Sequence, residues 1–257
     1  MARTVVRSIS AIALALTALG LAGAPVYAGE EDPAGPRRDF YFARPLGTIG
    51  LRGSWTFARA GSDLFDFVQE QLTLDKRDFN GPAIAAELGL TLKPRLDFVT
   101  GLAISRKSTG SEYREFVDNS RRSIEQTTRL KTVDLSGSVR FALLPRGYAV
   151  SQLAWVPRRV VPYVGTGAGA MWYEFEQAGD FVDFVDLSVF SDRFRSQGWA
   201  PSAHAFSGVD VRIHRRLFLT VEGRYVWAHA TLDEDFVDFE PIDLAGFRMA
   251  TGVNFVF

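Results

Sequence analysis

The sequence contains no cysteine and only three histidines. Without thiols, the chain has no disulfide framework, no thiolate metal site and no cysteine nucleophile. Its 29 basic and 30 acidic residues leave a formal net charge of −1, so it has no excess of positive charge for a nucleic-acid partner. Beyond residue 28 it also has no apolar run long enough for a membrane-spanning helix.

The first 28 residues have the pattern of a secretory signal peptide. Arg3 and Arg7 give a positive start, an apolar stretch follows over 11–22, and Val26-Tyr27-Ala28 supplies a small-x-small cleavage site. A retained anchor helix is the alternative, but the apolar stretch is too short to span a bilayer comfortably. Residues 29–46 are polar and are expected to form a periplasmic N-terminal tail.

From residue 47 to residue 257 the chain alternates between apolar and polar residues with period two, which predicts β-strands with one apolar face each. The eight alternating segments cover residues 49–57, 84–92, 96–105, 133–143, 163–175, 202–213, 217–227 and 247–257. Their length suits tilted strands that cross a bilayer and exceeds the usual length in soluble proteins. The fifth segment is glycine-rich, and its register is the least defined.

The links between these segments alternate in length. Lys93-Pro94-Arg95 and His214-Arg215-Arg216 are short, residues 144–160 form a longer link, and the other four run about 19 to 27 residues. Short periplasmic turns and long outer loops are typical of outer-membrane barrels. An even number of strands also places both ends of the domain in the periplasm.

Charged residues fall on the polar faces alone, away from the strand ends. The predicted lumen charges are Arg52, Glu87, Asp97, Asp134, Arg140, Glu174, Asp210, Arg212, Glu222, Arg224 and Arg248. A basic side chain that faces lipid at the midplane costs about 2–4 kcal/mol, so the pattern predicts lipid outside and a polar lumen inside. We expect these charges to pair across a packed interior, because eight strands leave room for side chains only. The alternative, an ion path, needs a continuous water-filled gap.

Aromatic residues are expected at both membrane interfaces, where an amphipathic ring prefers the headgroup level. The predicted outer girdle contains Trp55, Phe57, Tyr173, Trp199 and Trp227, and the inner girdle contains Tyr163, Phe255 and Phe257.

The segment Pro162-Tyr163-Val164-Gly165-Thr166-Gly167-Ala168-Gly169 and the closing Gly252-Val253-Asn254-Phe255-Val256-Phe257 resemble the small outer-membrane β-barrels of the OmpA/OmpX/OmpW-like family. The resemblance implies an all-β fold, an eight-stranded antiparallel up-and-down transmembrane β-barrel, in the cell outer membrane. It also implies that Phe255 and Phe257 form the C-terminal signal that the barrel-assembly machinery recognises. The family shares no single activity.

No catalytic residue, metal site or cofactor is predicted. His214 lies in a turn and His229 at an outer rim, while His204 and Ser202 face the lumen. A lipid hydrolase needs its nucleophile and base within hydrogen-bond reach and directed toward the bilayer. The Ser-x-His order here is also the reverse of the order that the resemblance to barrel deacylases implies.

Phe, Val and Asp recur in each of the four outer links. The repeated segments are residues 63–68, 115–118, 180–186 and 235–239. They are expected either to pack over the barrel mouth or to form a surface for a partner, for lipopolysaccharide or for calcium. The second link is basic, so Arg114, Arg121 and Arg122 are predicted to contact lipopolysaccharide phosphates.

These observations predict a monomeric, non-catalytic outer-membrane barrel with a role in envelope structure or in surface interaction through its Phe/Asp-rich loops. Two alternatives stay open. One is a narrow conduit for small or apolar solutes, and the other is a barrel enzyme that modifies lipid A. If the apolar faces packed against each other instead of lipid, the chain would be a soluble lipocalin-like barrel or sandwich.

Overall fold

The computed structural model describes residues 41–117, 121–151, 154–183 and 188–257. The predicted signal peptide and residues 29–40 of the predicted tail lie outside the described residues. No helix in the described ranges is long and apolar enough to cross a membrane.

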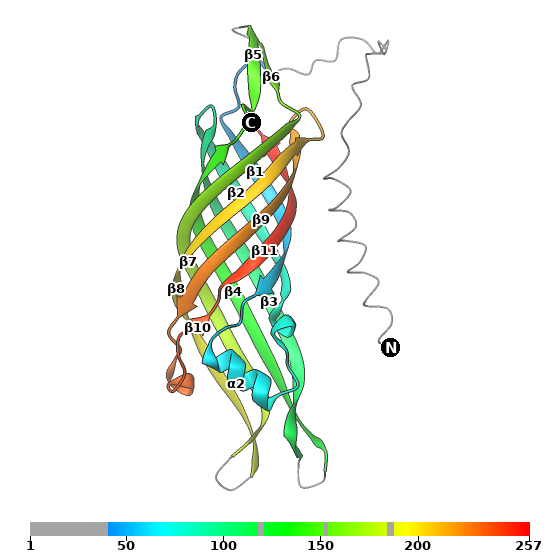
Figure 1. Ribbon diagram of the computed structural model, residues 1–257, viewed down its shortest axis with the longest axis vertical. Coiled ribbons are helices and arrows are strands. Elements are labelled where there is room, and N and C mark those ends of the chain that lie inside the picture. Colours follow the sequence, from blue (N-terminus) through cyan, green and yellow to red (C-terminus); the bar gives the residue numbers. More distant parts are fainter. Residues whose placement is uncertain (1–40, 118–120, 152–153, 184–187) are drawn as a thin grey trace. The chain divides into compact units, whose positions relative to one another are not determined.

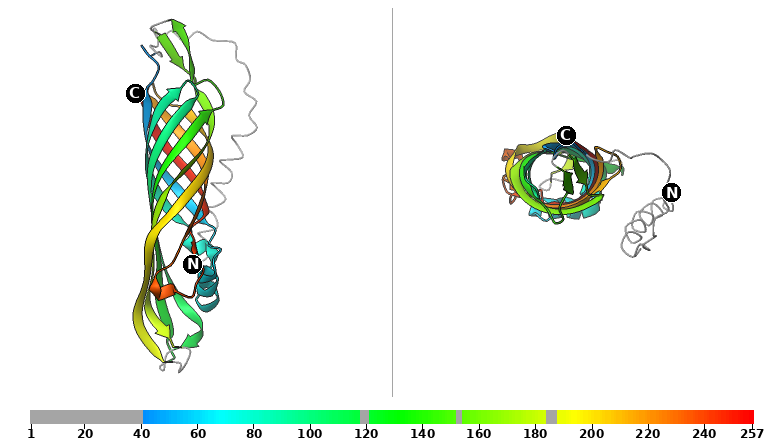
Figure 2. Two further views of the ribbon diagram at one scale, coloured as in Figure 1. Left: turned by 90° about the vertical axis from the view of Figure 1, so that its left-hand side faces the viewer. Right: turned by 90° about the horizontal axis from the view of Figure 1, so that it is seen from above.

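Eight antiparallel strands pair into a closed ring, and the short β10 (Ile242–Asp243) adds to β9. Figures 1 and 2 show the barrel that results. The wall strands are β1 (Gly47–Ala58), β2 (Gly81–Lys93), β3 (Leu96–Val117), β4 (Ser123–Ala142), β7 (Val160–Val182), β8 (Val189–Arg212), β9 (Leu217–Ala230) and β11 (Gly246–Val256). Each strand pairs with the next along the chain, and β11 pairs with β1 from Thr48↔Val256 to Ala58↔Gly246. The predicted up-and-down barrel is confirmed.

Shorter elements lie at the two ends of the barrel. One end holds the short β2–β3 and β8–β9 turns and a hairpin of β5 (Gly147–Ser151) and β6 (Ala154–Pro157). Short turns face the periplasm in outer-membrane barrels, so this is the periplasmic end. The outer end holds α2 (Asp63–Gln71), the 3-10 helices η1 (Lys76–Phe79) and η2 (Glu234–Phe236), and β10 (Ile242–Asp243).

Two of the four predicted outer loops are continuations of strands. The β3–β4 pairing runs from Leu96↔Phe141 to Val117↔Ser123, and the β7–β8 pairing runs out to Val182↔Val189. The prediction of long loops was therefore wrong for these two links. A four-stranded sheet of β3, β4, β7 and β8 extends past the ends of β1, β2, β9 and β11 (Figure 1).

Outer segments form hydrogen bonds to both edges of this extended sheet. On β8, the N–H groups of Arg195 and Gln197 donate to the carboxylates of Asp235 and Asp233, at 2.9 and 2.8 Å. On β3, Glu112 exchanges hydrogen bonds with the segment that follows α2. Unpaired strand edges invite association with other chains, so the acidic residues of the fourth outer link have a structural use here.

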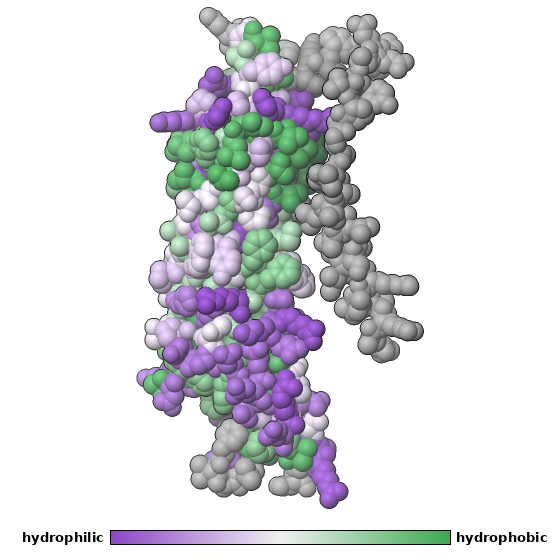
Figure 3. Space-filling model, viewed as in Figure 1, coloured by the Kyte–Doolittle hydropathy of each residue, from purple (hydrophilic) through white to green (hydrophobic). Residues whose placement is uncertain are grey.

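The predicted alternation of faces is confirmed in the wall. Figure 3 shows an apolar band around the visible wall, with hydrophilic side chains on either side of it. On β7 the outward residues from Pro162 to Trp172 carry no charge, and this stretch spans about 25 Å along the barrel axis at the usual strand rise and tilt. The barrel therefore presents a lipid-facing surface of the height that a bilayer requires.

The glycine-rich fifth segment, now β7, corrects part of the aromatic prediction. Tyr163 and Tyr173 alternate with the outward residues and are buried inside the barrel, so neither belongs to an interface girdle. Trp55, Trp199 and Trp227 are exposed on the outer wall, as expected. Phe57, Phe255 and Phe257 are also exposed.

The inward glycines of β7 make room for larger side chains of the neighbouring strand. A Cβ on Gly165 would lie 2.3 Å from the ring of Phe206, and one on Gly167 would lie 2.6 Å from Nε2 of His204. Alternate glycines therefore let β8 place an imidazole and a phenyl ring inside a narrow barrel.

An apolar cluster closes the outer mouth. Leu64, Phe65 and Val68 of α2 are almost completely buried, and the Phe65 ring packs edge-on against Phe175 of the wall. Phe236 of η2 completes the cluster against Phe175, with ring centroids 5.6 Å apart. Between the two expectations for the loops, the structure supports packing over the mouth, because the buried apolar residues of α2 and η2 belong to this cluster.

Candidate functional site

The middle of the barrel is filled by a ring of four charged side chains. Arg52 binds Glu87 at 2.7 Å and Glu222 at 2.6 Å, and Arg224 binds the same two carboxylates at 2.9 Å each. The Tyr163 hydroxyl donates a hydrogen bond of 2.8 Å to Glu222. The four groups come from β1, β2 and β9, and each carboxylate contacts both guanidinium groups.

A second cluster lies on the outer side of this ring. Arg248 binds Asp134 at 3.2 Å, and Ser202 donates to the same aspartate at 3.3 Å. His204 lies beside Ser138, with 2.8 Å between Nε2 and Oγ, and its buried Nδ1 has no hydrogen-bond partner within the described part of the chain. A catalytic triad needs a third group that orients the histidine, and no such group meets His204 in these ranges.

A third cluster lies on the periplasmic side. Asp97 accepts hydrogen bonds from Arg140, at 2.8 and 3.0 Å, and from Arg146. Asp210 faces Arg140 at 3.4 Å and accepts from Thr220 at 2.6 Å. Arg146 lies in the link before β5. Sequence reasoning missed it, because alternation carries no information about a residue outside a strand.

Nine of the eleven predicted lumen charges meet in these three clusters. Glu174 does not: it lies on the outer face of β7, where Arg195 of β8 binds it, and its placement in the lumen was wrong. Arg212 lies near the periplasmic mouth. Its positive charge acts on Tyr41 at this mouth: burial raises the pKa of the Tyr41 hydroxyl, and the charge of Arg212 lowers that pKa.

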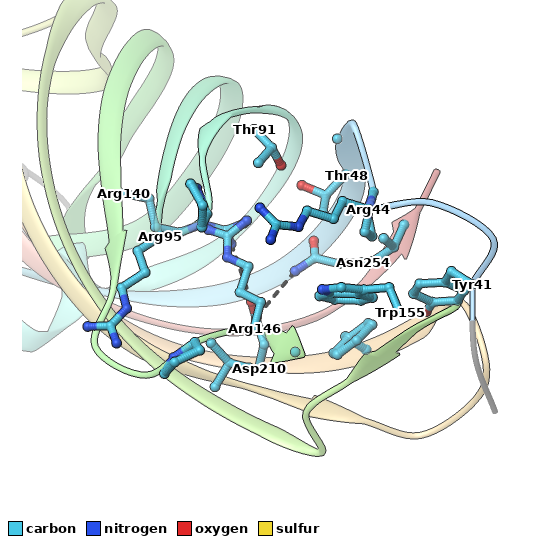
Figure 4. A pocket seen from close by; sticks show the side chains of 18 residues that line it. Tyr41, Arg44, Thr48, Thr91, Arg95, Arg140, Arg146, Trp155, Asp210 and Asn254 are labelled. Atoms are coloured by element: carbon cyan, nitrogen blue, oxygen red, sulfur yellow. Dashed lines mark hydrogen bonds and ion pairs between the residues drawn. The ribbon is translucent and has the colours of Figure 1, made fainter. Parts of the chain in front are cut away.

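A pocket of about 310 Å³ lies at the periplasmic mouth (Figure 4). Tyr41 and Trp155 close one side: their backbones exchange two hydrogen bonds, and their rings stack with centroids 5.5 Å apart. The Tyr41 hydroxyl donates to the carbonyl of Arg215 in the β8–β9 turn. Arg44, Arg95, Arg140, Arg146 and Asp210 are the charged side chains that line the pocket.

Charged side chains begin again on the outer wall directly beyond the apolar band. The outer cation band consists of Arg106 on β3, Arg129 and Lys131 on β4, and Arg193 and Arg195 on β8, and Glu174 and Glu176 of β7 lie among them. Five cations and two carboxylates leave an excess of positive charge.

The cation band contains a pair of like charges. Arg106 and Lys131 are direct cross-strand partners on the outward face, where like charges repel. Lys131 also lies over the ring of Trp172, with its ammonium 5.0 Å from the ring centroid. Arg129 binds Glu176 at 2.8 Å, and both groups remain partly accessible.

The arginines predicted to contact lipopolysaccharide lie further out. The Arg114 guanidinium donates to the carbonyls of Gln69 and Leu74, at 3.1 and 3.3 Å, and so holds α2 and the segment after it against β3. Arg121 and Arg122 lie at the tip of the β3–β4 hairpin, and Arg121 has a positive φ of 61°. The tip is about 30 Å along β4 from Lys131, well beyond the bilayer surface.

Metal binding by the acidic loops finds no support within the described ranges. There, no group of three or more His, Asp or Glu residues is arranged to hold a metal ion. Asp243, for example, accepts hydrogen bonds from the backbones of Gly61 and Ala245.

No protein-family model and no curated sequence matches the chain at a significant level. Solved structures do match. Neisserial surface protein A is 11% identical, with a TM-score of 0.47 over 82% of this chain and 97% of that protein. The outer membrane protein OprG from Pseudomonas aeruginosa is 9% identical, with a TM-score of 0.46 over 84% and 99% of the two chains.

A major outer membrane protein from Thermus thermophilus is 10% identical, with a TM-score of 0.41 over 82% and 99% of the two chains. Likenesses of this size concern architecture alone. The closed ring of strands and the lipid-facing band identify the chain as a small eight-stranded transmembrane β-barrel of the outer membrane.

Proposed function

We propose that this protein is a non-catalytic, non-conducting barrel that supports the outer membrane by binding the phosphate groups of lipopolysaccharide on its outer wall. The observation that carries the proposal is the cross-strand pair of Arg106 and Lys131, directly beyond the apolar band. A bound phosphate between the two cations would turn a repulsive pair into an attractive one.

The surroundings of this pair suit a phosphorylated lipid. Trp172 and Trp199, also a cross-strand pair, lie one step closer to the membrane centre on β7 and β8. Acyl chains would therefore lie against the apolar band while the phosphates reach the cations. Arg129 and Arg195 already pair with glutamates, but partly exposed ion pairs contribute little energy and can be exchanged for contacts to phosphate.

The filled interior supports the non-conducting part of the proposal. The three charge clusters occupy the lumen along its length, and the apolar cluster covers the outer mouth. A solute would have to separate buried ion pairs in order to pass. We expect no steady unitary current from the purified protein in a planar bilayer, and such a current would favour the conduit alternative.

The lipid contact is tested with the charge-neutral variant Arg106→Gln/Lys131→Gln. Its affinity for lipopolysaccharide in nanodiscs is expected to fall about tenfold, because two charge-assisted contacts are lost. Arg158→Gln/Arg159→Gln is the matched control, since it removes two exposed arginines at the periplasmic end, and it should bind like the unmodified protein.

Dephosphorylated lipopolysaccharide completes the test. The unmodified protein should bind it as weakly as the double glutamine variant binds the phosphorylated form. Equal affinity of the unmodified protein for the two lipids would contradict the proposal. An equal loss of affinity in Arg106→Gln/Lys131→Gln and in Arg158→Gln/Arg159→Gln would contradict it as well. Mass spectra of lipid A with and without the gene test the enzyme alternative, which an altered acyl pattern would support.

A further inference from the structure

We infer that the pocket at the periplasmic mouth is a binding site for a small organic anion with a flat or apolar portion. This site is separate from the outer cation band, and it does not depend on the lipid contact proposed above. Its walls come from the N-terminal segment (residues 41–46, before β1), the β5–β6 hairpin and the periplasmic ends of the barrel strands.

The charges around the pocket favour an anion. Four arginines line it against one aspartate. Arg140 and Arg146 share the buried carboxylate of Asp97, and Arg140 also faces Asp210. Arg44 and Arg95 have no carboxylate within ion-pair distance among the described residues, so their positive charge remains uncompensated there.

The apolar side of the pocket favours a flat or apolar group next to the anion. The stacked rings of Tyr41 and Trp155 form this side, and Figure 4 shows Arg44 reaching into the pocket between Thr48 and Asn254. A bidentate guanidinium contact to a carboxylate or phosphate is directional, and a ring face beside it selects what the anion is attached to. The volume of about 310 Å³ suits a compact molecule.

The position of the pocket indicates binding without passage. Its inner wall includes Arg140 and Asp210, which are members of the periplasmic charge cluster, and the ring of Arg52, Glu87, Glu222 and Arg224 fills the barrel beyond them. A ligand can therefore enter from the periplasm and leave only in that direction. The hairpin and the N-terminal segment are the parts that would respond to its presence, since Tyr41 joins them through Trp155.

Calorimetric titration of the detergent-solubilised full-length mature protein with phenyl phosphate and with inorganic phosphate tests this inference. Phenyl phosphate is expected to bind more tightly than inorganic phosphate, because only the former reaches the aromatic side. Arg44→Ala should weaken phenyl phosphate binding about tenfold. Trp155→Leu should remove the preference for phenyl phosphate while leaving the affinity for inorganic phosphate in place.

Two controls separate this site from other cations. Arg158→Ala removes an exposed arginine at the same end that does not line the pocket, and it should bind phenyl phosphate normally. Arg106→Gln/Lys131→Gln should also bind it normally, so a failure of the lipid contact leaves this result unaffected. Each variant is first checked for a heat-dependent shift in gel migration, which reports a folded barrel.

Absence of phenyl phosphate binding to the folded, unmodified protein would overturn the inference. Equal weakening by Arg44→Ala and Arg158→Ala would overturn it as well, because the contact would then be nonspecific attraction between charges.

Discussion

Removal of Arg52 from the central ring should destabilise the barrel strongly. In Arg52→Met, Glu87 and Glu222 would share Arg224 alone, and the ring would carry a net negative charge inside the protein. Breaking a buried ion pair costs about 3–5 kcal/mol. Since Arg224 and Tyr163 still contact the carboxylates, we expect a loss at the lower end, about 3 kcal/mol. Urea unfolding of the protein in lipid vesicles, followed by tryptophan fluorescence, measures this change.

A second substitution isolates the electrostatic part of the loss. Arg52→Met/Glu222→Gln restores a neutral ring, in which Arg224 and Glu87 remain paired at 2.9 Å. It should recover about 2 kcal/mol relative to the single variant, because the unpaired charge is gone. If the double variant were less stable than Arg52→Met, or if Arg52→Met cost no more than an exposed ion pair, the ring would not be what holds the barrel together.

Three further predictions concern the wall, the mouth and the glycine row. Val139→Arg puts a charge on the exposed, lipid-facing wall opposite Thr166, near the middle of the apolar band, and should cost about 2–4 kcal/mol by the same unfolding assay, whereas Val139→Ala should cost much less. Phe65→Ala leaves a cavity in the apolar cluster. It should cost about 3–5 kcal/mol and speed proteolysis of the outer loops. The half-exposed Phe67 is its control, and equal effects would contradict the packing. Gly167→Val should prevent the heat-dependent gel shift, because its side chain would collide with His204, and a normally folded variant would refute that reading of the row.

The wall could be predicted from the sequence because lipid imposes a strict rule on it. Within the bilayer, one face of each strand excludes charge and the other does not, so alternation specified which residues point inward for seven of the eight segments. The prediction failed for the fifth segment because Gly165, Gly167 and Gly169 make one face neither clearly apolar nor clearly polar. The opposite face carries Thr166 and Ala168. Neither face then stands out as apolar.

Beyond the bilayer the same rule no longer applies. At Glu174 the outward face of β7 meets water instead of lipid, so a polar residue there gives no indication of the lumen, and its carboxylate lies outside with Arg195. The long strands β3, β4, β7 and β8 were interpreted as loops for the same reason. Their outer portions pair regularly, but their side chains alternate less sharply once no lipid excludes charge.

The periplasmic pocket lay outside the reach of alternation altogether. It depends on Tyr41, Arg44 and Arg146, which belong to segments outside the barrel strands, and on their meeting the ends of strands far away in the sequence. The hairpin of β5 and β6 holds Trp155 against Tyr41, and the carboxylate of Asp97 holds Arg146. Hydrophobic periodicity describes neighbouring residues along the chain, so it does not predict contacts between segments that are far apart in the sequence.

The filled interior explains why function is sought at the surfaces of this barrel. Eight strands enclose space for side chains and little else, and here buried arginines and carboxylates use that space to satisfy each other. Each such group needs a partner, so the interior cannot be emptied for transport without a large loss of stability. The cations that lack this constraint, Arg106 and Lys131 on the wall and Arg44 at the mouth, are therefore the ones that remain available to bind other molecules.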